Sequence, residues 1–179
     1  MSATAPSATR PETWSGSTRP DTPGPGGGRS RQTVGVNRSD FAHFVSLPVQ
    51  WGDMDSIGHV NNAVYFRYIE SGRIAYFEAI DATAGLAGSG EGPILADIQC
   101  SFIGQLRYPA QIDIGTRTAK LGTKSFAVEA GIFLAGEDEP VATSKAVVVW
   151  FDYANQATTA LPDALRQRVL DLEAVPPEM

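Results

Sequence analysis

The chain has 179 residues, of which 42% are hydrophobic, and carries 14 Lys and Arg against 20 Asp and Glu, a formal net charge of −6. This acidity excludes general binding of nucleic acids or anionic membranes, because both need clustered Lys and Arg. No apolar run reaches the roughly 20 residues that cross a bilayer, and the lone Cys100 excludes an internal disulfide or a cysteine-based zinc site. We expect a soluble, cytoplasmic protein built on one folded domain.

The first 38 residues differ from the remainder in composition. They are rich in Ser, Thr, Pro and Gly and include the run Pro23-Gly24-Pro25-Gly26-Gly27-Gly28. Such a segment cannot bury enough apolar surface to offset the entropy of an ordered chain. Scattered Arg and Ser leave an organelle transit peptide open, but the amphipathic pattern of one is missing. We therefore predict a disordered, dispensable tail over residues 1–38 and a folded domain over residues 39–179.

The first strand and the long helix are predicted from their apolar periods. Apolar residues alternate with others over residues 44–51, as in a strand with one buried face that includes Trp51. Pro48 cannot donate to a β ladder, so this strand is expected at a sheet edge. A helix is predicted over residues 62–80, and it is expected to be mostly enclosed because only a narrow strip of it is polar. Gly72 in its middle predicts the close approach of another backbone.

The later part of the chain predicts a sheet and a closing helix. Four strand patterns occupy residues 94–103, 110–121, 125–135 and 141–153. Gly122-Thr123-Lys124 and residues 136–140 have the composition of hairpin connections, so the last strands should be antiparallel neighbours. The Gly- and Ala-rich residues 81–92 are expected to form a turn or a mobile rim, and residues 162–172 a short helix.

These elements predict an α+β fold in which a curved, five-stranded antiparallel sheet wraps one long apolar helix. A single sheet would leave the helix half open. We therefore expect two subunits to join, either edge to edge or back to back.

The residues that can carry chemistry lie between the first strand and the helix. The run Trp-Gly-Asp-Met-Asp-Ser-Ile-Gly-His-Val-Asn-Asn-Ala-Val-Tyr, residues 51–65, sets carboxylates, an imidazole and carboxamides beside a helix start. Backbone N–H groups there lack intrahelical partners, and the helix dipole favours negative charge. Asp55 can attack a carbonyl carbon or activate water as a general base, and both roles stay open. N–H groups of residues 58–62 can stabilise the developing charge, and Gly58 allows a close backbone approach.

Several residues of this run also have structural interpretations. Asp53 is interpreted as a turn or cap residue. His59 can orient water or donate to a substrate carbonyl, or it can simply bond a backbone carbonyl. Asn62 is the candidate N-cap of the helix, and Asn61 is expected to bond the loop backbone.

The helix itself offers further candidates. Glu70 is either a second catalytic carboxylate or the ion-pair partner of Arg67 or Arg73 at helical spacing. Tyr65 is a core residue more often than a substrate contact. Cys100 is expected to be an inert core residue on the apolar side of its strand.

The strand, the apolar helix and the Asp-x-Asp-x-x-Gly-His-Val-Asn-Asn-x-x-Tyr run between them resemble the hotdog-fold acyl-CoA thioesterases, specifically the 4-hydroxybenzoyl-CoA thioesterase-like family. The similarity covers roughly residues 44–155, and its specific part lies within residues 49–73. The resemblance implies a hotdog fold, a homodimer or homotetramer, and an acyl-CoA or acyl-carrier-protein thioester as substrate, with no cofactor and no metal. It also implies that Asp55 is the catalytic carboxylate.

Catalytic and substrate-binding candidates follow from the run and the resemblance together. The catalytic candidates are Asp55, His59 and Glu70, and the substrate-binding candidates are Gly58, Val60, Asn61, Asn62 and Tyr65. The 4-hydroxybenzoyl type has Asn before the helix Tyr and an aliphatic residue after the Gly, where this chain has Val64 and His59. The His-Val-Asn-Asn version is similar instead to general acyl thioesterases, including plant acyl-carrier-protein enzymes, whose imidazole joins the carboxylate. An aromatic acyl group is therefore disfavoured.

Two other functions compete with a thioesterase. The fold could serve as a non-catalytic module that binds or senses acyl-CoA, since fold does not fix function. A hotdog enoyl-thioester dehydratase is the second, although its Asp/His pair normally lies in a different local sequence.

Overall fold

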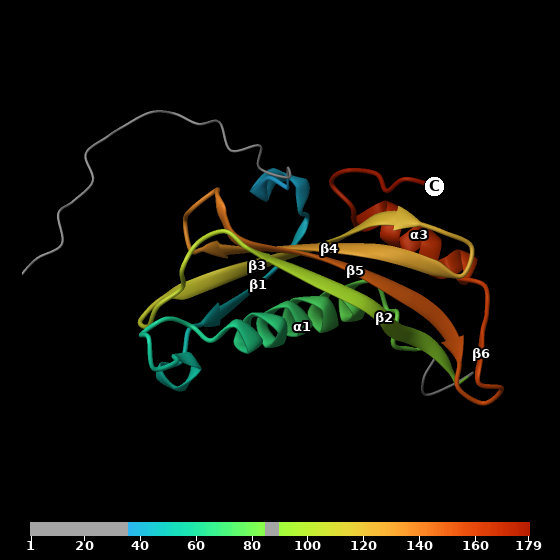
Figure 1. The fold of residues 1–179 in the computed structure, drawn as a ribbon. Coiled ribbons are helices and arrows are strands. Elements are labelled where there is room, and N and C mark those ends of the chain that lie inside the picture. The colour runs from blue at the N-terminus through green and yellow to red at the C-terminus, as the bar shows by residue number, and fades with distance from the viewer. Residues whose placement is uncertain (1–35, 85–89) are drawn as a thin grey trace, which may run out of the picture. The chain divides into compact units, whose positions relative to one another are not determined.

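The computed structural model describes residues 36–84 and 90–179. In chain order the elements are η1 (Arg38–Asp40), β1 (His43–Pro48), η2 (Trp51–Asp53), α1 (Asn62–Ala79), β2 (Glu91–Phe102), β3 (Gln111–Leu121), β4 (Ser125–Leu134), β5 (Pro140–Asp152), β6 (Ala157–Thr158) and α3 (Asp163–Leu172) (Figure 1). The predicted tail lies outside the described residues up to residue 35, and the predicted rim does so over residues 85–89.

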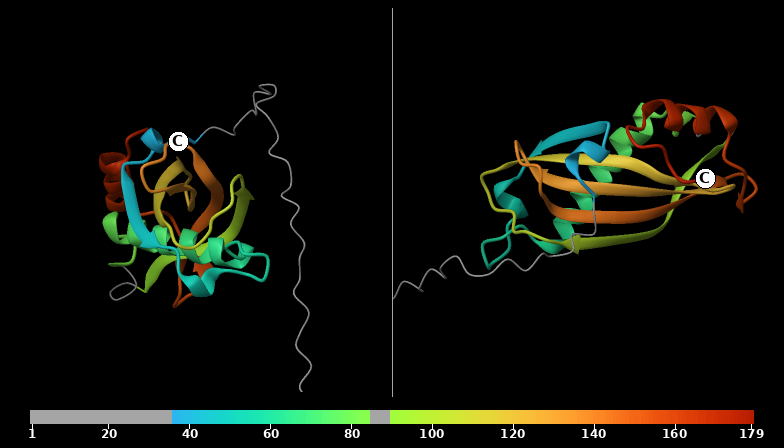
Figure 2. Two further views of the ribbon diagram at one scale, coloured as in Figure 1. Left: turned by 90° about the vertical axis from the view of Figure 1, so that its left-hand side faces the viewer. Right: turned by 90° about the horizontal axis from the view of Figure 1, so that it is seen from above.

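The described strands form one antiparallel sheet in the order β1-β3-β4-β5-β2, with the short β6 added beside β5. Tight turns join β3 to β4 and β4 to β5, and both pairs are antiparallel as predicted. Of the strands that the structure describes, β1 pairs with β3 alone, so Pro48 ends an edge strand. The sheet curls around α1, which lies along its concave face (Figures 1 and 2). The predicted fold class, a curved five-stranded sheet around one long helix, is confirmed.

The start of α1 is fixed by Asn61 and not by Asn62, so the predicted N-cap is wrong by one residue. Asn61 has the extended backbone of a cap, φ −60° and ψ 139°, and its Oδ1 accepts from the Ala63 N–H at 2.9 Å. The Asn61 N–H also donates to the Asp53 carbonyl at 2.9 Å. This second bond confirms that Asn61 bonds the loop backbone. Asn62 is the first residue of the helix, and it is exposed.

α1 buries one side against two apolar clusters. The cluster under its N-terminal half includes Tyr65 and Ile69, and the cluster under its C-terminal half includes Tyr76 and Phe77 and continues into α3. The opposite side of the helix keeps Phe66 and Ile74 exposed. One sheet therefore leaves the helix half open, as expected, because the sheet curls around only part of its circumference (Figure 2).

Two packing predictions are wrong. A Cβ on Gly72 would lie 2.5 Å from Ile114 Cγ2 and 3.0 Å from Thr116 Oγ1, so side chains rather than a backbone press on the helix. Trp51 does not lie on a buried strand face, since it is 76% exposed. β1 ends at Pro48, and Asp53 Oδ2 accepts from the Gln50 N–H at 2.9 Å, which turns the chain into η2.

The C-terminal residues complete one end of the sheet. The pairing of β1 with β3 ends at Thr116, and the C-terminal residues bind the rest of this edge of β3. The Glu178 N–H donates to the Ala119 carbonyl at 2.9 Å, and the Leu121 N–H donates to the Glu178 carbonyl at 2.8 Å. Among the residues that the structure describes, no helix is long and apolar enough to cross a membrane.

Candidate active site at the start of α1

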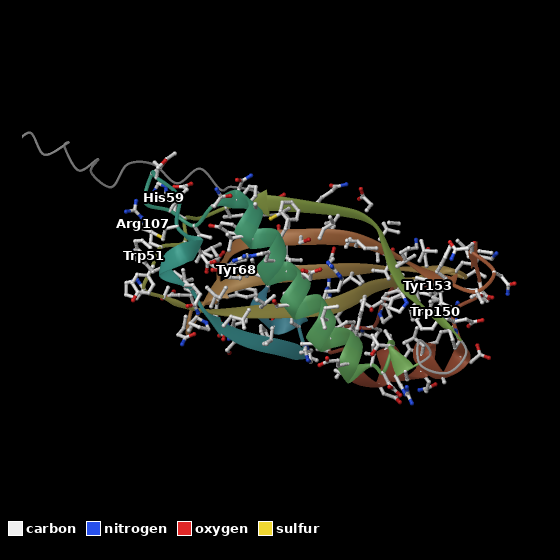
Figure 3. The ribbon with its side chains drawn as sticks, turned by 90° about the horizontal axis from the view of Figure 1, so that it is seen from below. Trp51, His59, Tyr68, Arg107, Trp150 and Tyr153 are labelled. Carbon is white, nitrogen blue, oxygen red and sulfur yellow. The ribbon has the colours of Figure 1, made fainter. Side chains whose placement is uncertain are left out.

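The motif between η2 and α1 folds as a narrow loop over residues 54–60, closed by a bridge between Met54 and Val60. The Asp55 N–H donates to the His59 carbonyl at 2.8 Å, and the Gly58 N–H donates to the Asp55 carbonyl at 3.1 Å. Gly58 has φ +82°, a backbone conformation that L side chains rarely adopt, and this explains the glycine. Asp55 and His59 therefore lie opposite each other across the neck of the loop. His59 lies at the same end of the domain as Trp51 (Figure 3).

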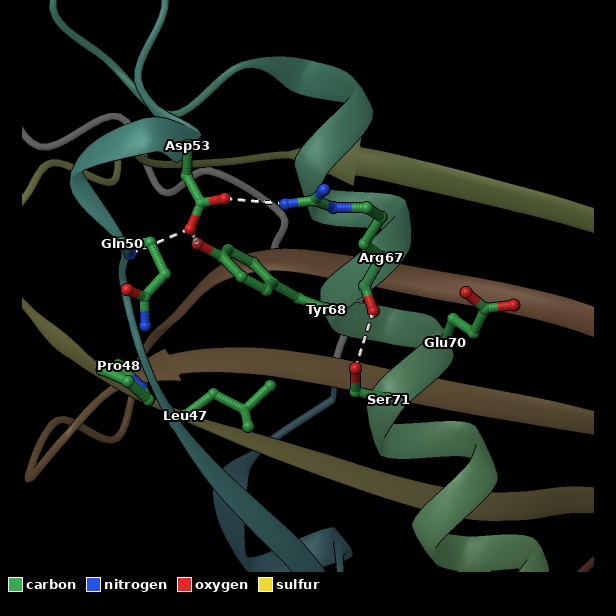
Figure 4. A pocket seen from close by; sticks show the side chains of 8 residues that line it. All are labelled: Leu47, Pro48, Gln50, Asp53, Arg67, Tyr68, Glu70 and Ser71. Atoms are coloured by element: carbon green, nitrogen blue, oxygen red, sulfur yellow. Dashed lines mark hydrogen bonds and ion pairs between the residues drawn. The ribbon is translucent and has the colours of Figure 1, made fainter.

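Asp53 is the buried carboxylate of the motif, with 3% of its surface exposed. Its Oδ2 accepts from the Tyr68 hydroxyl at 2.6 Å and from the Gln50 N–H at 2.9 Å, and its Oδ1 accepts from Arg67 Nη2 at 2.7 Å (Figure 4). Burial, with the Asp53 carboxylate beside it, raises the pKa of Tyr68 above its ordinary range. The predicted cap role of Asp53 is confirmed, and its side-chain bonds additionally fix η2 to α1.

Asp55, two residues later, has far fewer contacts. It is half-buried, and its Oδ1 accepts from the Ile57 N–H at 2.8 Å. Within the described part of the chain, Oδ2 has no hydrogen-bond or ion-pair partner. One oxygen of this carboxylate is therefore available to another molecule.

The backbone N–H groups beside Asp55 are mostly engaged. Acceptors are present for the N–H groups of Ile57, Gly58, Val60, Asn61, Ala63 and Val64. Over residues 57–64, the N–H groups of His59 and Asn62 have no acceptor among the described residues. The Asn62 N–H opens α1, where the helix dipole adds positive potential. Of the N–H groups of residues 58–62, which the sequence predicts to stabilise the developing charge, only those of His59 and Asn62 have no acceptor among the described residues.

The His59 ring contacts Arg107, a pairing that the sequence did not predict. Its Nε2 lies 2.7 Å from Arg107 Nη2, whose other contact is the Gln105 Oε1 at 3.2 Å (Figure 3). Since a guanidinium only donates, Nε2 is the acceptor and the ring proton lies on Nδ1. The Nδ1–H of His59 is thus the ring's donor.

Val60 and Tyr65 are buried and hold the segment that carries Arg107. The Val60 N–H donates to the Leu106 carbonyl at 2.9 Å, and the Tyr65 hydroxyl accepts from the Leu106 N–H at 3.2 Å. The Tyr65 ring meets the edge of Phe102, with ring centroids 5.1 Å apart. Burial raises the pKa of Tyr65. The Val60 backbone and the Tyr65 side chain therefore fix the crossover between β2 and β3 against the start of α1.

Glu70 lies apart from the loop. It is eight residues beyond the first residue of α1, or about 12 Å along the helix axis. Its side chain is 63% exposed, and its Oε1 lies 4.0 Å from Arg73 Nη2. The predicted ion pair with Arg73 is present, whereas Arg67 binds Asp53 instead.

A pocket of about 410 Å³ lies on the β1-facing flank of α1. It is lined by Leu47, Pro48, Gln50, Asp53, Arg67, Tyr68, Glu70 and Ser71 (Figure 4). Asp55 and His59 are not among these residues, since they lie on the loop beyond η2. Among residues 36–84 and 90–179, no group of three His, Cys, Asp or Glu side chains could hold a metal ion.

Comparison with protein families identifies the motif and the fold together. The sequence model of the thioesterase-like superfamily matches residues 49–169, from the end of the first strand pattern into α3. The chain belongs to this family. The resemblance inferred from the motif is therefore confirmed, and the prediction of a thioester hydrolase holds at the level of the family.

Individual relatives of this thioesterase-like chain agree with the assignment. A thioesterase of Thermus thermophilus in complex with coenzyme A and Zn is 31% identical, with a TM-score of 0.66 over 76% of this chain and 98% of that one. A protein of Pseudomonas aeruginosa is 26% identical, with a TM-score of 0.68 over 80% of this chain and 98% of that one. A chloroplastic acyl-acyl carrier protein thioesterase of Arabidopsis thaliana is 28% identical over 135 residues, which are 75% of this chain and 70% of that protein.

The structure of this thioesterase-like chain separates the candidates into two groups. Asp55, Gly58, His59 and the N–H of Asn62 lie together on the loop and the first residue of α1. Val60, Asn61 and Tyr65 shape the surrounding backbone, and Glu70 lies further along the helix. Arg107 could not be found from local spacing, because it reaches His59 only through the crossover between β2 and β3.

Proposed function

We propose that this protein hydrolyses an acyl thioester of coenzyme A or acyl carrier protein to the free acid and the thiol, with Asp55 as the catalytic carboxylate. The observation that carries the proposal is the difference between the two carboxylates of the motif. Asp53 is buried and accepts three hydrogen bonds, whereas Asp55 keeps Oδ2 without a partner among the described residues. The names of two relatives, one for acyl-carrier-protein substrates and one in complex with coenzyme A, support a thioester of either carrier.

The chemistry needs a group that reaches the carbonyl carbon and donors for the oxygen that becomes negative. Asp55 Oδ2 either attacks this carbon, which forms a mixed anhydride and expels the thiolate, or takes a proton from the water that attacks it. Over residues 57–64, the N–H groups of His59 on the loop and Asn62 on α1 have no acceptor among the described residues, and they are assigned to the carbonyl oxygen. A thiolate leaves readily, so a strong general acid is not required.

His59 is assigned a supporting role. Because Arg107 occupies Nε2, the ring offers Nδ1–H as a donor, and this donor serves the substrate carbonyl or orients the water. Glu70 is a weaker candidate, since it lies about 12 Å along α1 from the helix start. We keep it as a secondary carboxylate to be tested beside Asp55.

We infer that the working protein is a homodimer or homotetramer. α1 carries exposed Phe66 and Ile74 away from its two apolar clusters, and β2 carries exposed Leu95 and Phe102. Among the described strands, β2 pairs only with β5, and so it offers an edge to a second copy. Sedimentation of the purified protein tests this inference, and a monomer at micromolar concentration would contradict it.

The decisive experiment measures thiol release from short, long and aromatic acyl-CoAs. Asp55→Asn should lower kcat by about a hundredfold to ten-thousandfold, because it removes the only group assigned to attack or to proton transfer. Asp138→Asn makes the same charge change on an exposed hairpin and should leave the rate unchanged. The thermal midpoints of both variants should match that of the unmodified protein.

Other outcomes of this experiment separate the competing functions. A folded protein that binds acyl-CoA and releases no thiol from any of them would favour the non-catalytic binding module. Hydration of crotonyl-CoA in place of thiol release would favour the dehydratase. Full activity in Asp55→Asn would move the catalytic carboxylate to Asp53 or Glu70.

A further inference from the structure

Buried polar atoms without a partner gather at one level of the sheet. Within the described residues these atoms are His43 Nδ1, Arg73 Nη1, Thr116 Oγ1 and Ser144 Oγ. His43, Thr116 and Ser144 lie on strands, and the strand register places them in one line across the sheet. His43 pairs with Thr116, Thr116 pairs with Ala130, and Ala130 pairs with Ser144. Cys100 of β2 pairs with Ser144 and continues this line. We call His43, Thr116, Ala130, Ser144 and Cys100 the polar row.

The polar row crosses the sheet at the border of the two apolar clusters, with Ala130 and Cys100 packed in the cluster under the N-terminal half of α1. On β5, Ala142 belongs to the cluster under the N-terminal half of α1 and Ala146 to the cluster under its C-terminal half, with Ser144 between them. A buried polar group left without a partner costs about 1–3 kcal/mol. Several such groups at one level therefore indicate that a bound molecule or water supplies their partners.

Arg73 extends over this row from the helix. Gly72 lies against Thr116 of β3, and the Phe77 ring, one turn further along the same flank as Arg73, meets Phe126 of β4 with ring centroids 5.9 Å apart. Arg73 follows Gly72 directly, so it lies at the same level of α1, and it lies on the same helix flank as Phe77. Arg73 therefore lies on the side of α1 that faces β4, and β4 pairs with β5, on which Ser144 lies.

The guanidinium of Arg73 is poorly paired for a buried cation. The residue is 7% exposed, and its one ion-pair partner within the described residues is the exposed Glu70, at 4.0 Å. Burial lowers the pKa of this guanidinium, yet arginine stays charged in proteins. A buried charge of this kind is strongly destabilising unless an anion approaches it.

We propose that Arg73, together with Ser144 Oγ, binds a carboxylate carried at the far end of the acyl chain. The inference rests on the proposed function, in which the thioester lies at the start of α1. Arg73 is eleven residues beyond Asn62, or about 16 Å along the helix axis. Between these points the exposed Phe66 of α1 and Phe102 of β2 offer apolar surface for a run of methylene groups. The preferred substrates are thus monothioesters of medium-chain dicarboxylic acids.

The test compares CoA thioesters in pairs of equal chain length, suberyl with octanoyl and sebacyl with decanoyl. The unmodified protein should give a kcat/KM about tenfold or more higher for the carboxylated member of a pair, as expected for hydrogen bonds to a charged group. Arg73→Met should abolish this difference and leave hydrolysis of the plain acyl group unchanged. Arg73→Lys, which keeps the charge, should retain part of it, and Ser144→Ala should reduce it.

Arg168→Met provides the matched control, because it removes an equal charge from an exposed site on α3. This variant should keep the full preference for the carboxylated member. Equal rates for both members in the unmodified protein would overturn the inference. An equal loss on both members in Arg73→Met would do the same, since the residue would then act on every acyl group alike.

A second measurement does not depend on turnover. Free suberate should raise the thermal midpoint of the unmodified protein more than octanoate does, and Arg73→Met should lose this increment. A protein that hydrolyses no thioester but binds suberate through Arg73 would refute the proposed function and keep the subsite. If suberate has no effect and Arg73→Met weakens subunit association in sedimentation, the guanidinium belongs to a subunit contact and the subsite is refuted.

Discussion

The two ends of α1 each meet a carboxylate, and the two carboxylates differ in how completely they are paired. At the C-terminal end, Glu173 follows α3, accepts from the Tyr76 hydroxyl, and accepts from the Thr118 N–H at 2.6 Å. The Tyr76 hydroxyl also lies 2.8 Å from Thr118 Oγ1, so the cluster is closed on itself. At the N-terminal end, Asp55 accepts only from the Ile57 N–H. Both bonds to Glu173 reach Oε1 and come from α1 and β3, whereas the bond to Asp55 comes from its own loop. Glu173 therefore ties α3 to two elements distant in sequence, and Asp55 ties no two elements together.

Asp53 belongs with Glu173 in this comparison, although it is two residues from Asp55. Its partners come from η2 and from α1, so it fastens the turn to the helix. Proximity in sequence to a reactive residue therefore does not give Asp53 the same role. The number of internal partners separates the two carboxylates, and this separation can be tested by mutation.

The largest effect on stability is expected for Asp53→Ala. The change leaves the buried Tyr68 hydroxyl and the Gln50 N–H without their acceptor, which should lower the free energy of unfolding by about 3 kcal/mol. The Arg67 side chain is exposed, so loss of its ion pair contributes only a small part. Urea denaturation measures the change. A variant of unaltered stability that has lost thiol release would instead identify Asp53 as the reacting carboxylate.

Glu173→Gln should lower the free energy of unfolding by about 2 kcal/mol and leave thiol release unchanged. Both hydrogen bonds reach Oε1, so the amide oxygen of Gln can still accept them, but they lose their charge-assisted strength. Glu178→Gln is the matched control, because this nearby carboxylate is exposed. If Glu173→Gln and Asp55→Asn impaired turnover equally, the contrast between the two ends of α1 would be wrong.

A smaller effect is expected in the pH dependence of stability. Burial raises the pKa of Glu173 above its ordinary value of 4.5. The folded protein then holds this proton more tightly than the unfolded chain, so the contribution to stability is greatest below pH 4.5 and declines as pH rises through the pKa of the folded state. As pH rises from 4.5 through the pKa of Glu173 in the folded state, the free energy of unfolding of the unmodified protein should fall relative to that of Glu173→Gln.

Asp113 should give the opposite slope. Hydrogen bonds from Ser46 and Arg38 lower its pKa below 3.8, so its contribution is present above that pH and is lost as pH falls through the folded pKa. Free energies of unfolding measured against pH for the unmodified protein, Glu173→Gln and Asp113→Asn separate the two groups. Parallel curves for the unmodified protein and Glu173→Gln would contradict the assigned direction for Glu173.

Much of the fold could be predicted from the sequence because it depends on local pattern. The alternation of apolar residues indicates the strands of the two hairpins, and the lack of an N–H at Pro48 places the first strand at an edge. The motif also indicates the loop that holds Asp55 and His59. The prediction for Trp51 fails because Asp53, as the cap of η2, turns the chain away before the alternation ends.

The remaining features depend on contacts that are distant in sequence. Arg107 reaches His59 across 48 positions, and no local spacing indicates that pairing. The polar row requires the register of every neighbouring pair of strands, which becomes known only when the sheet is assembled. The N-cap was missed for a more local reason, since two adjacent Asn residues have the same propensity and only the backbone of Asn61 is extended.

The smallest effect tests that N-cap directly. Asn61→Ala removes the oxygen that accepts from the Ala63 N–H and should lower the free energy of unfolding by about 1 kcal/mol. Asn62→Ala changes an exposed side chain in the first helical position and should leave stability within about 0.5 kcal/mol of the original. Urea denaturation compares the two. Because the Asn62 N–H is assigned to the substrate, Asn62→Ala should also keep thiol release, whereas Asn61→Ala should reduce it by loosening the helix start. If Asn62→Ala lowered the free energy of unfolding more than Asn61→Ala does, Asn62 would be the N-cap of α1.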